Sequence, residues 1–248
     1  MNMTEDKIEI RGVYFDNLSM DEALQVALEM IDEGGCHVIH TPNAEIVQLC
    51  VEKPEYYEVI NSSDMTVPDG AGVILASKIL KKPLKKGKVA GVELGEALAR
   101  EASVRGLRLY LLGGKPGIAE EAKRRLCEKY PGLDICGCSD GYFTDDGPVI
   151  QKINDSGADI LFVCLGVPKQ ELWMKKNRGV LNVSLMAGLG GSLDVYSGTV
   201  KRAPEIFIRL GLEWLYRLIR EPRRIGRMMK LPKFVVGTIA ASFRRKKA

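Results

Sequence analysis

The chain has 248 residues, of which 46% are hydrophobic and 27% are charged, and its formal net charge is +4. This length suits one sizeable core, or a core of about 200 residues with an appendage. The composition is typical of a globular protein and excludes a disordered, collagen-like or fibrous chain.

Short apolar runs alternate with segments of helical periodicity. Residues 8–15 predict an early strand or hairpin, and Ser19 to Glu22 have the spacing of a capping box before a helix over 21–35. Further strands are expected at residues 36–41, 65–68, 107–114, 133–143, 158–166 and 182–191. Further helices are expected at residues 44–64, interrupted at Pro54, and at 72–80, 93–104, 116–130, 147–157 and 168–177. The alternation predicts an α/β fold, an open and mainly parallel Rossmann-like sheet with crossover helices.

Polar residues and glycines follow five of these strands. In open α/β sheets, ligands bind beyond the carboxyl ends of the strands, and glycines let backbone N–H groups approach a phosphate. Five such strand ends in one sheet predict a ligand pocket. The residues are Thr41, Asn43, Asp69, Gly113, Gly114, Gln170, Glu171, Gly188, Gly190, Gly191 and Asp194.

Several of these residues also have a structural interpretation. Asn43 and Asp69 could each cap the helix that follows. Gly113 and Gly114 could form a tight turn, and the acid Glu171 stands in a first helical turn, where acids are favourable. The segment GLGGSLD lacks the G-x-G-x-x-G spacing of a dinucleotide site. Taken one by one, these residues leave structural and functional interpretations open.

The last part of the chain is strongly basic. Residues 201–248 contain 14 Lys and Arg against 3 Asp and Glu, a net charge of +11, whereas residues 1–200 carry −7. We therefore expect a catalytic body over 1–200 and a helical basic appendage over 201–248. Such an appendage favours an anionic partner.

Residues 205–220 are helical in pattern and rich in Leu, Ile, Trp and Tyr. The appendage could be a solvated basic helix packed on the body. We expect instead an interfacial segment, with aromatics at headgroup level and basic residues on anionic lipid, that also closes over the site. Four arginines spaced three, four and three residues apart would form one stripe on lipid or a diphosphate unless Pro222 breaks the helix. They are Arg217, Arg220, Arg224 and Arg227.

The compartment follows from the cysteines and the N-terminal segment. The six cysteines lie mostly in apolar stretches without metal-ligand spacing, and His37 and His40 lack a third ligand, so we expect buried thiols and no metal. The segment MNMTEDKIEIRG has acids and no apolar run of a secretory signal. No window reaches the ~20 apolar residues of a spanning helix. We expect a cytoplasmic protein that does not cross a membrane.

The segments TPNAE, PDGAGV, LGVPKQE and AGLGGSLDVYSGTVKRAP, followed by LEWLYRLIREPRRIGR, resemble successive signatures of the bacterial WecG/TagA/CpsF family of glycosyltransferases. The similarity runs in order from about residue 8 to about 230 and is greatest to the TagA branch, the N-acetylmannosaminyltransferases of wall teichoic acid synthesis. It implies inverting, metal-independent transfer of N-acetylmannosamine from UDP to the 4-hydroxyl of N-acetylglucosamine on undecaprenyl diphosphate, in β-1,4 linkage and without a cofactor. A related transferase with another UDP-hexose, such as the uronic acid of N-acetylmannosamine, is the alternative.

The resemblance also implies roles for single residues. Asp69 falls on the family's proposed general base, and Thr41, Asn43 and Gln170 fall on polar positions tied to activity. The glycines at 188, 190 and 191, with Asp194, fall in the segment associated with the nucleotide.

One segment departs from the family. An expected R-x-x-G-x-D stretch reads KVAGVE, so Lys88 and Glu93 stand for arginine and aspartate. Lysine keeps the positive charge but lacks the bidentate fork that suits a diphosphate.

The chemistry of glycosyl transfer suits these residues. A base must take the proton of the acceptor hydroxyl, and positive charge or N–H groups must stabilise the departing diphosphate. Asp69 can supply the first, and Lys88 with the glycine loops the second. An aspartate has an ordinary pKa near 3.9, so partial burial would make Asp69 a better base.

Two other classes of protein compete with this interpretation. A nicotinamide-dependent oxidoreductase would need the dinucleotide fingerprint. A nucleic-acid-binding protein could use the basic appendage, but Trp214 and the leucine periodicity favour a membrane or protein surface. We therefore expect a protein peripheral to the inner face of the cell membrane that binds no nucleic acid, and its apolar helices make a homo-oligomer plausible.

Overall fold

The computed structural model describes residues 7–220 and 225–245. Its main sheet has six strands, all parallel, in the order β4-β3-β8-β7-β5-β6. These strands are β3 (His37–His40), β4 (Met65–Thr66), β5 (Arg108–Gly113), β6 (Asp134–Ser139), β7 (Ile160–Cys164) and β8 (Leu185–Gly188). The first strands of the chain, β1 (Lys7–Ile10) and β2 (Val13–Asp16), pair as an antiparallel hairpin. The expected open, parallel α/β sheet is confirmed.

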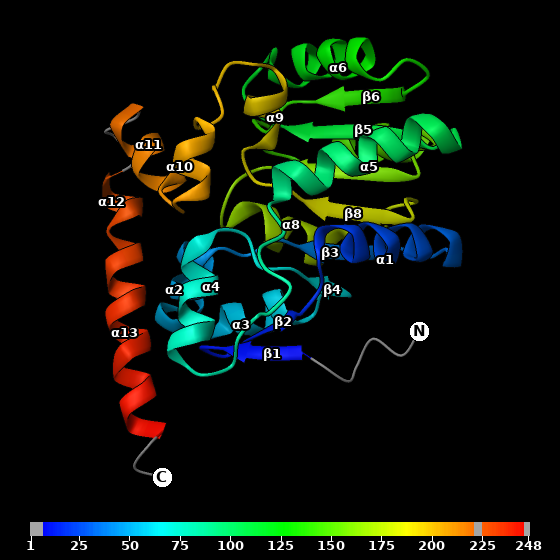
Figure 1. Ribbon diagram of the computed structural model, residues 1–248. Coiled ribbons are helices and arrows are strands. Elements are labelled where there is room, and N and C mark those ends of the chain that lie inside the picture. The colour runs from blue at the N-terminus through cyan, green and yellow to red at the C-terminus, as the bar shows by residue number, and fades with distance from the viewer. Residues whose placement is uncertain (1–6, 221–224, 246–248) are drawn as a thin grey trace.

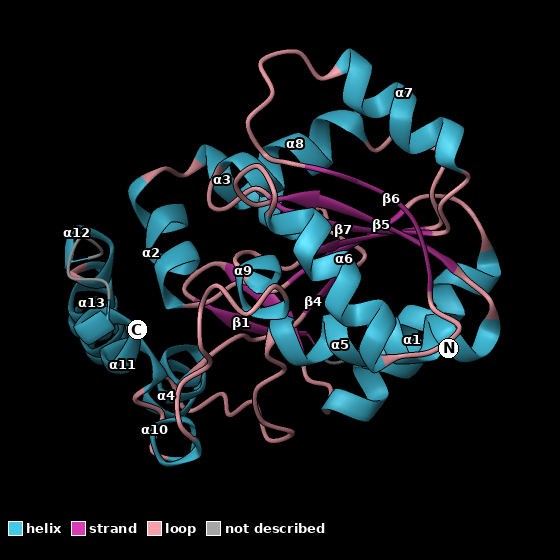
Figure 2. Cartoon of the chain, turned by 90° about the horizontal axis from the view of Figure 1, so that it is seen from above, coloured by secondary structure: helices cyan, strands magenta, loops and turns pink. Residues whose placement is uncertain are grey.

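Helices cover both faces of this sheet (Figure 2). One face carries α1 (Met20–Glu33), α5 (Gly91–Arg105) and α6 (Ile118–Lys129), and the other carries α7 (Gly147–Ser156) and α8 (Lys169–Asn177). Three helices follow β3 and β4 near the hairpin, namely α2 (Ala44–Glu52), α3 (Glu55–Asn61) and α4 (Ala71–Ile79), and the short α9 (Ser192–Tyr196) follows β8. The capping box of α1 is present, since Ser19 and Glu22 bond each other's backbone N–H.

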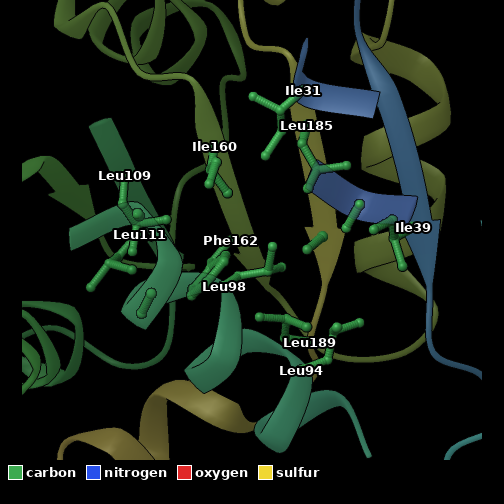
Figure 3. Close-up of a cluster of buried hydrophobic side chains, with 14 of the residues drawn as sticks. Ile31, Ile39, Leu94, Leu98, Leu109, Leu111, Ile160, Phe162, Leu185 and Leu189 are labelled. Carbon is green, nitrogen blue, oxygen red and sulfur yellow. The ribbon is translucent and has the colours of Figure 1, made fainter. Parts of the chain in front are cut away.

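The core follows from the alternation of side chains along the central strands. In β7, Ile160 and Phe162 face α5, whereas Leu161 and Val163 face α8. Figure 3 shows the first of these layers, where Phe162 lies among leucines of α5 and β5. Strands buried on both faces need continuous apolar runs, and the sequence of β7, ILFVC, is such a run.

A third apolar cluster joins the hairpin, α2, α3 and α4 to the last helix of the chain. This helix, α13 (Lys230–Arg245), packs against α2 and α4, and Phe234 has no exposed surface. The hydroxyl of Ser242 donates to the carbonyl of Ile79 (3.2 Å), and Arg11 of the hairpin bonds the carbonyl of Gly237. The end of the basic segment is therefore built into the body.

Three shorter helices precede α13, namely α10 (Glu205–Arg209), α11 (Glu213–Arg220) and α12 (Ile225–Met228). Residues 205–220, expected as one helix, form two because the chain turns at Gly211, whose φ of 70° is left-handed. The expected break at Pro222 lies outside the described residues. The strand arrows in Figure 1 point toward α10–α13, so the appendage stands at the carboxyl edge of the sheet. Among the described residues, no helix combines the length and apolar character needed to span a membrane.

Candidate active site

A cavity of about 720 Å³ lies beyond the carboxyl ends of the strands. This volume lies within the usual range for small-molecule sites. The loops after β3, β4, β5, β7 and β8 all contribute to its wall, together with the appendage. The expected residues that line it are Thr41, Asn43, Asp69, Lys88, Gly114, Gln170, Gly190, Gly191 and Asp194. The predicted convergence of separate strand ends on one pocket is therefore what the structure shows.

Asp69 lies in the loop between β4 and α4. Its N–H donates to the carbonyl of Pro42 (3.2 Å), and the carbonyl of Pro68 accepts from Val89 (2.9 Å), so two neighbouring loops hold this one. The N-cap of α4 is Gly70, and no side chain among the described residues caps that helix. The structural interpretation of Asp69 as a cap is therefore wrong. Its half-buried carboxylate is at the wall of the cavity.

Thr41 links the ends of β3 and β8. Its Oγ1 donates to the carbonyl of Gly188 at 2.9 Å, and the side chain is buried. A Cβ on Gly91 would lie 2.9 Å from Oγ1, so α5 can begin beside Thr41 only because residue 91 is glycine. With its proton directed at Gly188, the hydroxyl can offer a lone pair to a ligand.

Asn43 has the capping role that its type suggests. Its Oδ1 accepts from the N–H groups of Glu45 (2.9 Å) and Ile46 (3.1 Å) at the start of α2. The side chain also lines the cavity, so capping and ligand contact are compatible. With Oδ1 engaged twice, the amide nitrogen is the group that Asn43 can present to a hydroxyl or a phosphate oxygen.

Gln170 and Glu171 open α8 and are both buried. The Nε2 of Gln170 donates to Oε1 of Glu171 (3.0 Å), and its Oε1 accepts the N–H of Gly190 (2.8 Å). The hydroxyl of Tyr56 donates to Oε2 of Glu171 (2.6 Å). Burial raises the pKa of Glu171 above its usual range, against the lowering effect of these hydrogen bonds. Glu171 thus contacts Tyr56 and Gln170 instead of lining the cavity.

The expected glycines divide into two groups. Gly114, Gly190 and Gly191 line the cavity. Gly113 and Gly188 are buried strand-end residues in close contacts: a Cβ on Gly113 would collide with the carbonyl of Cys164, and one on Gly188 would lie 2.8 Å from Nε2 of Gln170. The two strand-end glycines allow close packing of the strand ends, and the others leave backbone exposed to a ligand.

Lys88 lines the cavity from the loop before α5, and its neighbour Val89 bonds the loop of Asp69. Lys88 and Asp69 thus line one cavity, from two loops joined by a backbone hydrogen bond. Glu93, the other residue of the KVAGVE departure, forms an ion pair with Arg202 at the start of the appendage. Of the two residues that depart from the family pattern, Lys88 therefore lines the cavity and Glu93 pairs with the appendage.

Five described residues of the basic segment line the cavity, namely Ile208, Gly211, Glu213, Trp214 and Leu231, and Val200 lines it just before that segment. The expectation that the appendage closes over the site thus has a structural basis in these residues. Arg220 is exposed and lies over the ring of Tyr216, 5.8 Å from its centre. The side chains of Arg217 and Arg227, and the whole of Arg224, lie outside the described part of the chain.

Sequence reasoning also missed Lys115 and Tyr142, two exposed residues on the wall beside β5 and β6. Lys115 directly follows the glycine pair after β5, and this position could have identified it. Tyr142 follows β6, and no motif in the neighbouring sequence marks it as a cavity residue. A cation and an aromatic ring at this end of the cavity are groups that a nucleotide diphosphate would use.

Cys164 is the thiol in the wall of the cavity, at the end of β7. Burial raises its pKa to about 12, so the thiol stays protonated at neutral pH. A protonated, buried thiol is a poor nucleophile. Chemistry through the carboxylate of Asp69 suits the site better than attack by Cys164.

Comparison with known proteins agrees with this geometry. The family model described as glycosyl transferase WecG/TagA/CpsF family matches residues 8–248. A Bacillus spizizenii protein is 40% identical over 209 residues, which cover 84% of this chain and 81% of that protein. A Bacillus subtilis strain 168 protein is 37% identical over 206 residues, 83% and 80% of the two chains.

A Staphylococcus aureus strain MW2 protein is 34% identical over 245 residues, which cover 98% of this chain and 96% of that protein. All three relatives are named N-acetylglucosaminyldiphosphoundecaprenol N-acetyl-beta-D-mannosaminyltransferase. The match extends over nearly the whole chain, including the strand ends that form the cavity. The chain therefore belongs to the WecG/TagA/CpsF family of glycosyltransferases.

Proposed function

We propose that the protein transfers N-acetylmannosamine from UDP to the 4-hydroxyl of N-acetylglucosamine carried on undecaprenyl diphosphate, with inversion and without a metal. The names of the three relatives, which are 34–40% identical to this chain, support this sugar and acceptor. A related transferase that uses another UDP-hexose, such as the uronic acid of N-acetylmannosamine, is the second candidate. The family is shared by both candidates, and only the donor differs.

The observation that carries the proposal is the shared cavity of Asp69 and the glycine-rich ends of β5, β7 and β8. In the transfer step, the acceptor oxygen attacks the anomeric carbon while the carboxylate of Asp69 takes its proton. The bond between that carbon and the UDP oxygen breaks, and UDP leaves with the electron pair. The attack from the opposite face inverts the anomeric carbon.

The leaving diphosphate gains negative charge and needs nearby positive groups. Lys88 and Lys115 both line the cavity, and the backbone around Gly190 is close to the start of α9. We propose that these groups stabilise UDP as it departs. Thr41 and Asn43 lie nearer the loop of Asp69 and would orient hydroxyl groups of the sugars.

A lipid-linked acceptor requires contact with a membrane surface. The appendage exposes large apolar side chains on α10–α13 beside basic ones such as Arg209, Arg220 and Lys233. This set defines the proposed membrane face, and its apolar members are Ile206, Leu210, Ile219, Ile225, Met229, Val236, Ile239 and Phe243. Apolar insertion combined with cationic attraction is how interfacial helices bind anionic bilayers. We therefore propose a peripheral association of residues 201–248 with the inner face of the cell membrane.

Product analysis tests the chemistry. The protein is incubated with a panel of UDP-sugars and a short-chain analogue of N-acetylglucosamine diphosphoundecaprenol, and the product mass is read. A disaccharide of N-acetylmannosamine and N-acetylglucosamine is expected, and NMR of its new linkage should show β-1,4 connectivity. Preferred use of another UDP-hexose would replace this donor, and no transfer from any UDP-sugar would overturn the proposal.

Liposome sedimentation tests the membrane face. Ile239→Ser and Phe243→Ser change exposed residues, so folding should persist while binding to anionic vesicles weakens. Deletion of the whole appendage is less informative, because it also removes buried Phe234. Equal binding by wild type and the double variant would refute the face. Tighter binding to duplex DNA than to vesicles at the same salt concentration would favour a nucleic-acid partner instead.

A further inference from the structure

The appendage packs directly against the start of α4, the helix that follows the loop of Asp69. A Cβ on Gly211 would lie 2.8 Å from the Cβ of Ala71, and a Cβ on Gly72 would lie 3.0 Å from Leu231. Ala71 and Gly72 follow Asp69 by two and three residues. The wall that the appendage adds to the cavity is therefore next to the proposed base.

Trp214 lies on this wall, one turn after Gly211, at the start of α11. The turn before it is closed by a hydrogen bond from the N–H of Leu212 to the carbonyl of Phe207 (2.8 Å). The rings of Phe207 and Tyr216 pack together with their centres 5.4 Å apart. Tyr216 thus joins α10 to α11, whereas Trp214 contributes an indole to the cavity. This position differs from the place at the lipid headgroups that the sequence pattern favours.

The order of strands assigns the two ends of the cavity to different substrates. Three strands separate β4 from β5, so at ~4.8 Å per strand their ends lie about 19 Å apart. Lys115, Gly114 and Tyr142 stand at the β5 end, which suits the nucleoside end of the donor, whose diphosphate then extends toward the acceptor end of the cavity. Asp69 stands at the β4 end and must meet the acceptor hydroxyl. Trp214 lines the cavity three residues after Gly211, which packs against Ala71, so we assign Trp214 to the acceptor end.

We propose that Trp214 is the platform on which the acceptor hexose stacks, an inference that rests on the proposed function. The face of an indole is electron-rich, and the C–H groups on one face of a pyranose carry partial positive charge, so the two attract when they stack. Stacking fixes the ring while its hydroxyl turns toward Asp69. The appendage therefore recognises the sugar as well as the lipid.

Steady-state kinetics with a water-soluble short-chain acceptor test the platform without a membrane. Trp214→Ala should raise the acceptor KM by about tenfold, while Trp214→Phe, which keeps an aromatic face, should stay near wild type. The KM for the UDP-sugar should be unchanged in both variants. Val104→Ala, an exposed change at the far end of α5, is the control and should leave both KM values unchanged. A rise in the donor KM alone, or no change in either KM, would overturn the assignment.

Tryptophan fluorescence gives a readout that needs no turnover. The chain has two tryptophans, and Trp173 is buried on α8 with its Nε1–H bonded to Asp146 (3.1 Å). In a Trp173→Phe background the emission comes from Trp214 alone. The acceptor analogue should shift this emission in a saturable way, whereas UDP alone should not.

The two measurements separate failure of the platform from failure of the proposed function. If no UDP-sugar is turned over but the acceptor analogue shifts the Trp214 emission, the stacking of the acceptor on Trp214 is supported and the proposed reaction is wrong. If the wild type transfers sugar but the emission responds only to UDP, Trp214 belongs to the donor site and the inference is wrong. If Trp214→Ala loses liposome binding while its acceptor KM is unchanged, Trp214 contacts lipid headgroups and the inference is wrong.

Discussion

The side-chain amide of Gln170 donates to the carboxylate of Glu171 over 3.0 Å, and this bond sets which way the amide faces. Its carbonyl oxygen is thereby directed at the N–H of Gly190, 2.8 Å away. Glu171 is itself held by the hydroxyl of Tyr56. A chain of buried hydrogen bonds thus runs from α3 to the loop after β8, which lines the cavity.

Replacing Glu171 with Gln should lower kcat by about tenfold. A glutamine offers both N–H and C=O groups, so the amide of Gln170 can face either way and Gly190 loses its enforced partner. Steady-state kinetics with the UDP-sugar and the lipid analogue measure the effect. Glu29→Gln on the exposed face of α1 is the matched change and should leave kcat unaltered. An unaltered kcat in Glu171→Gln would show that the orientation of Gln170 does not matter for turnover.

The same substitution should alter how stability depends on pH. Burial raises the folded-state pKa of Glu171 above the ordinary 4.5, so the folded protein binds this proton more readily than the unfolded chain. The contribution to stability is present at low pH and is lost as pH rises through the raised pKa. Urea unfolding should therefore show Glu171→Gln gaining stability relative to wild type between pH 4.5 and 7. A constant difference across this range would mean that the carboxyl is not perturbed.

Asp69→Asn should reduce transfer by about a hundredfold to ten-thousandfold, the usual contribution of a general base. Asparagine has nearly the same size as aspartate and keeps the backbone hydrogen bonds of the loop, so we expect the protein to fold and its melting temperature to change little. Asp155→Asn on the exposed side of α7 provides the comparison. Turnover near the wild-type level in Asp69→Asn would remove this residue as the base.

The sequence could predict the sheet and the meeting of its loops because both depend on local patterns. Continuous apolar runs such as ILFVC need burial on both faces, and parallel strands bring all their carboxyl ends to one edge. This is why residue order and type alone suffice to assign Asp69, Thr41 and Gln170 to one pocket. The cap at Asn43 was likewise readable from residue type.

The partners of amphipathic helices could not be predicted in the same way. Periodicity shows that a helix has an apolar side but not what covers that side. The aromatic residues of the appendage were expected at the lipid headgroups, yet Trp214 lines the cavity and Phe234 is buried where α13 packs against α2 and α4. The role of Glu171 could not be predicted either, because its hydrogen-bond partner Tyr56 is 115 residues away in the sequence.

Substitution of two phenylalanines of α13 tests whether this helix is part of the folded core. Phe234→Ala should reduce the free energy of unfolding by about 3–5 kcal/mol, because it leaves a cavity in the cluster shared with the hairpin and α2. Phe243→Ala, at a site 63% exposed on the same helix, should cost less than about 0.5 kcal/mol. Urea unfolding measures both. Equal small effects would show that α13 contributes little to the stability of the body.

His40, at the end of β3, should make the protein sensitive to mild acid. Its ring is buried, and among the described residues its Nδ1 has no hydrogen-bond partner. Burial lowers the pKa of His40 from 6.5 to about 4, although a hydrogen bond with the backbone of Val59 and the charge of Asp64 act in the opposite direction. Between these two pH values the unfolded chain binds a proton that the folded protein does not. Stability is therefore lost as pH falls through this window, by about 3 kcal/mol in total.

Urea unfolding at pH 7, 6, 5 and 4.5 measures this loss, and His40→Gln should remove most of it. Carboxylates also titrate at the lower end, so the test is the difference between variant and wild type at each pH. His37→Gln serves as the comparison, since the chain has two histidines and the ring of His37 is less buried. Proton NMR gives an independent readout, because each variant identifies the resonance of the remaining histidine. A ring of His40 that titrates near 6.5 would contradict its burial in the folded protein and remove the basis for the acid sensitivity.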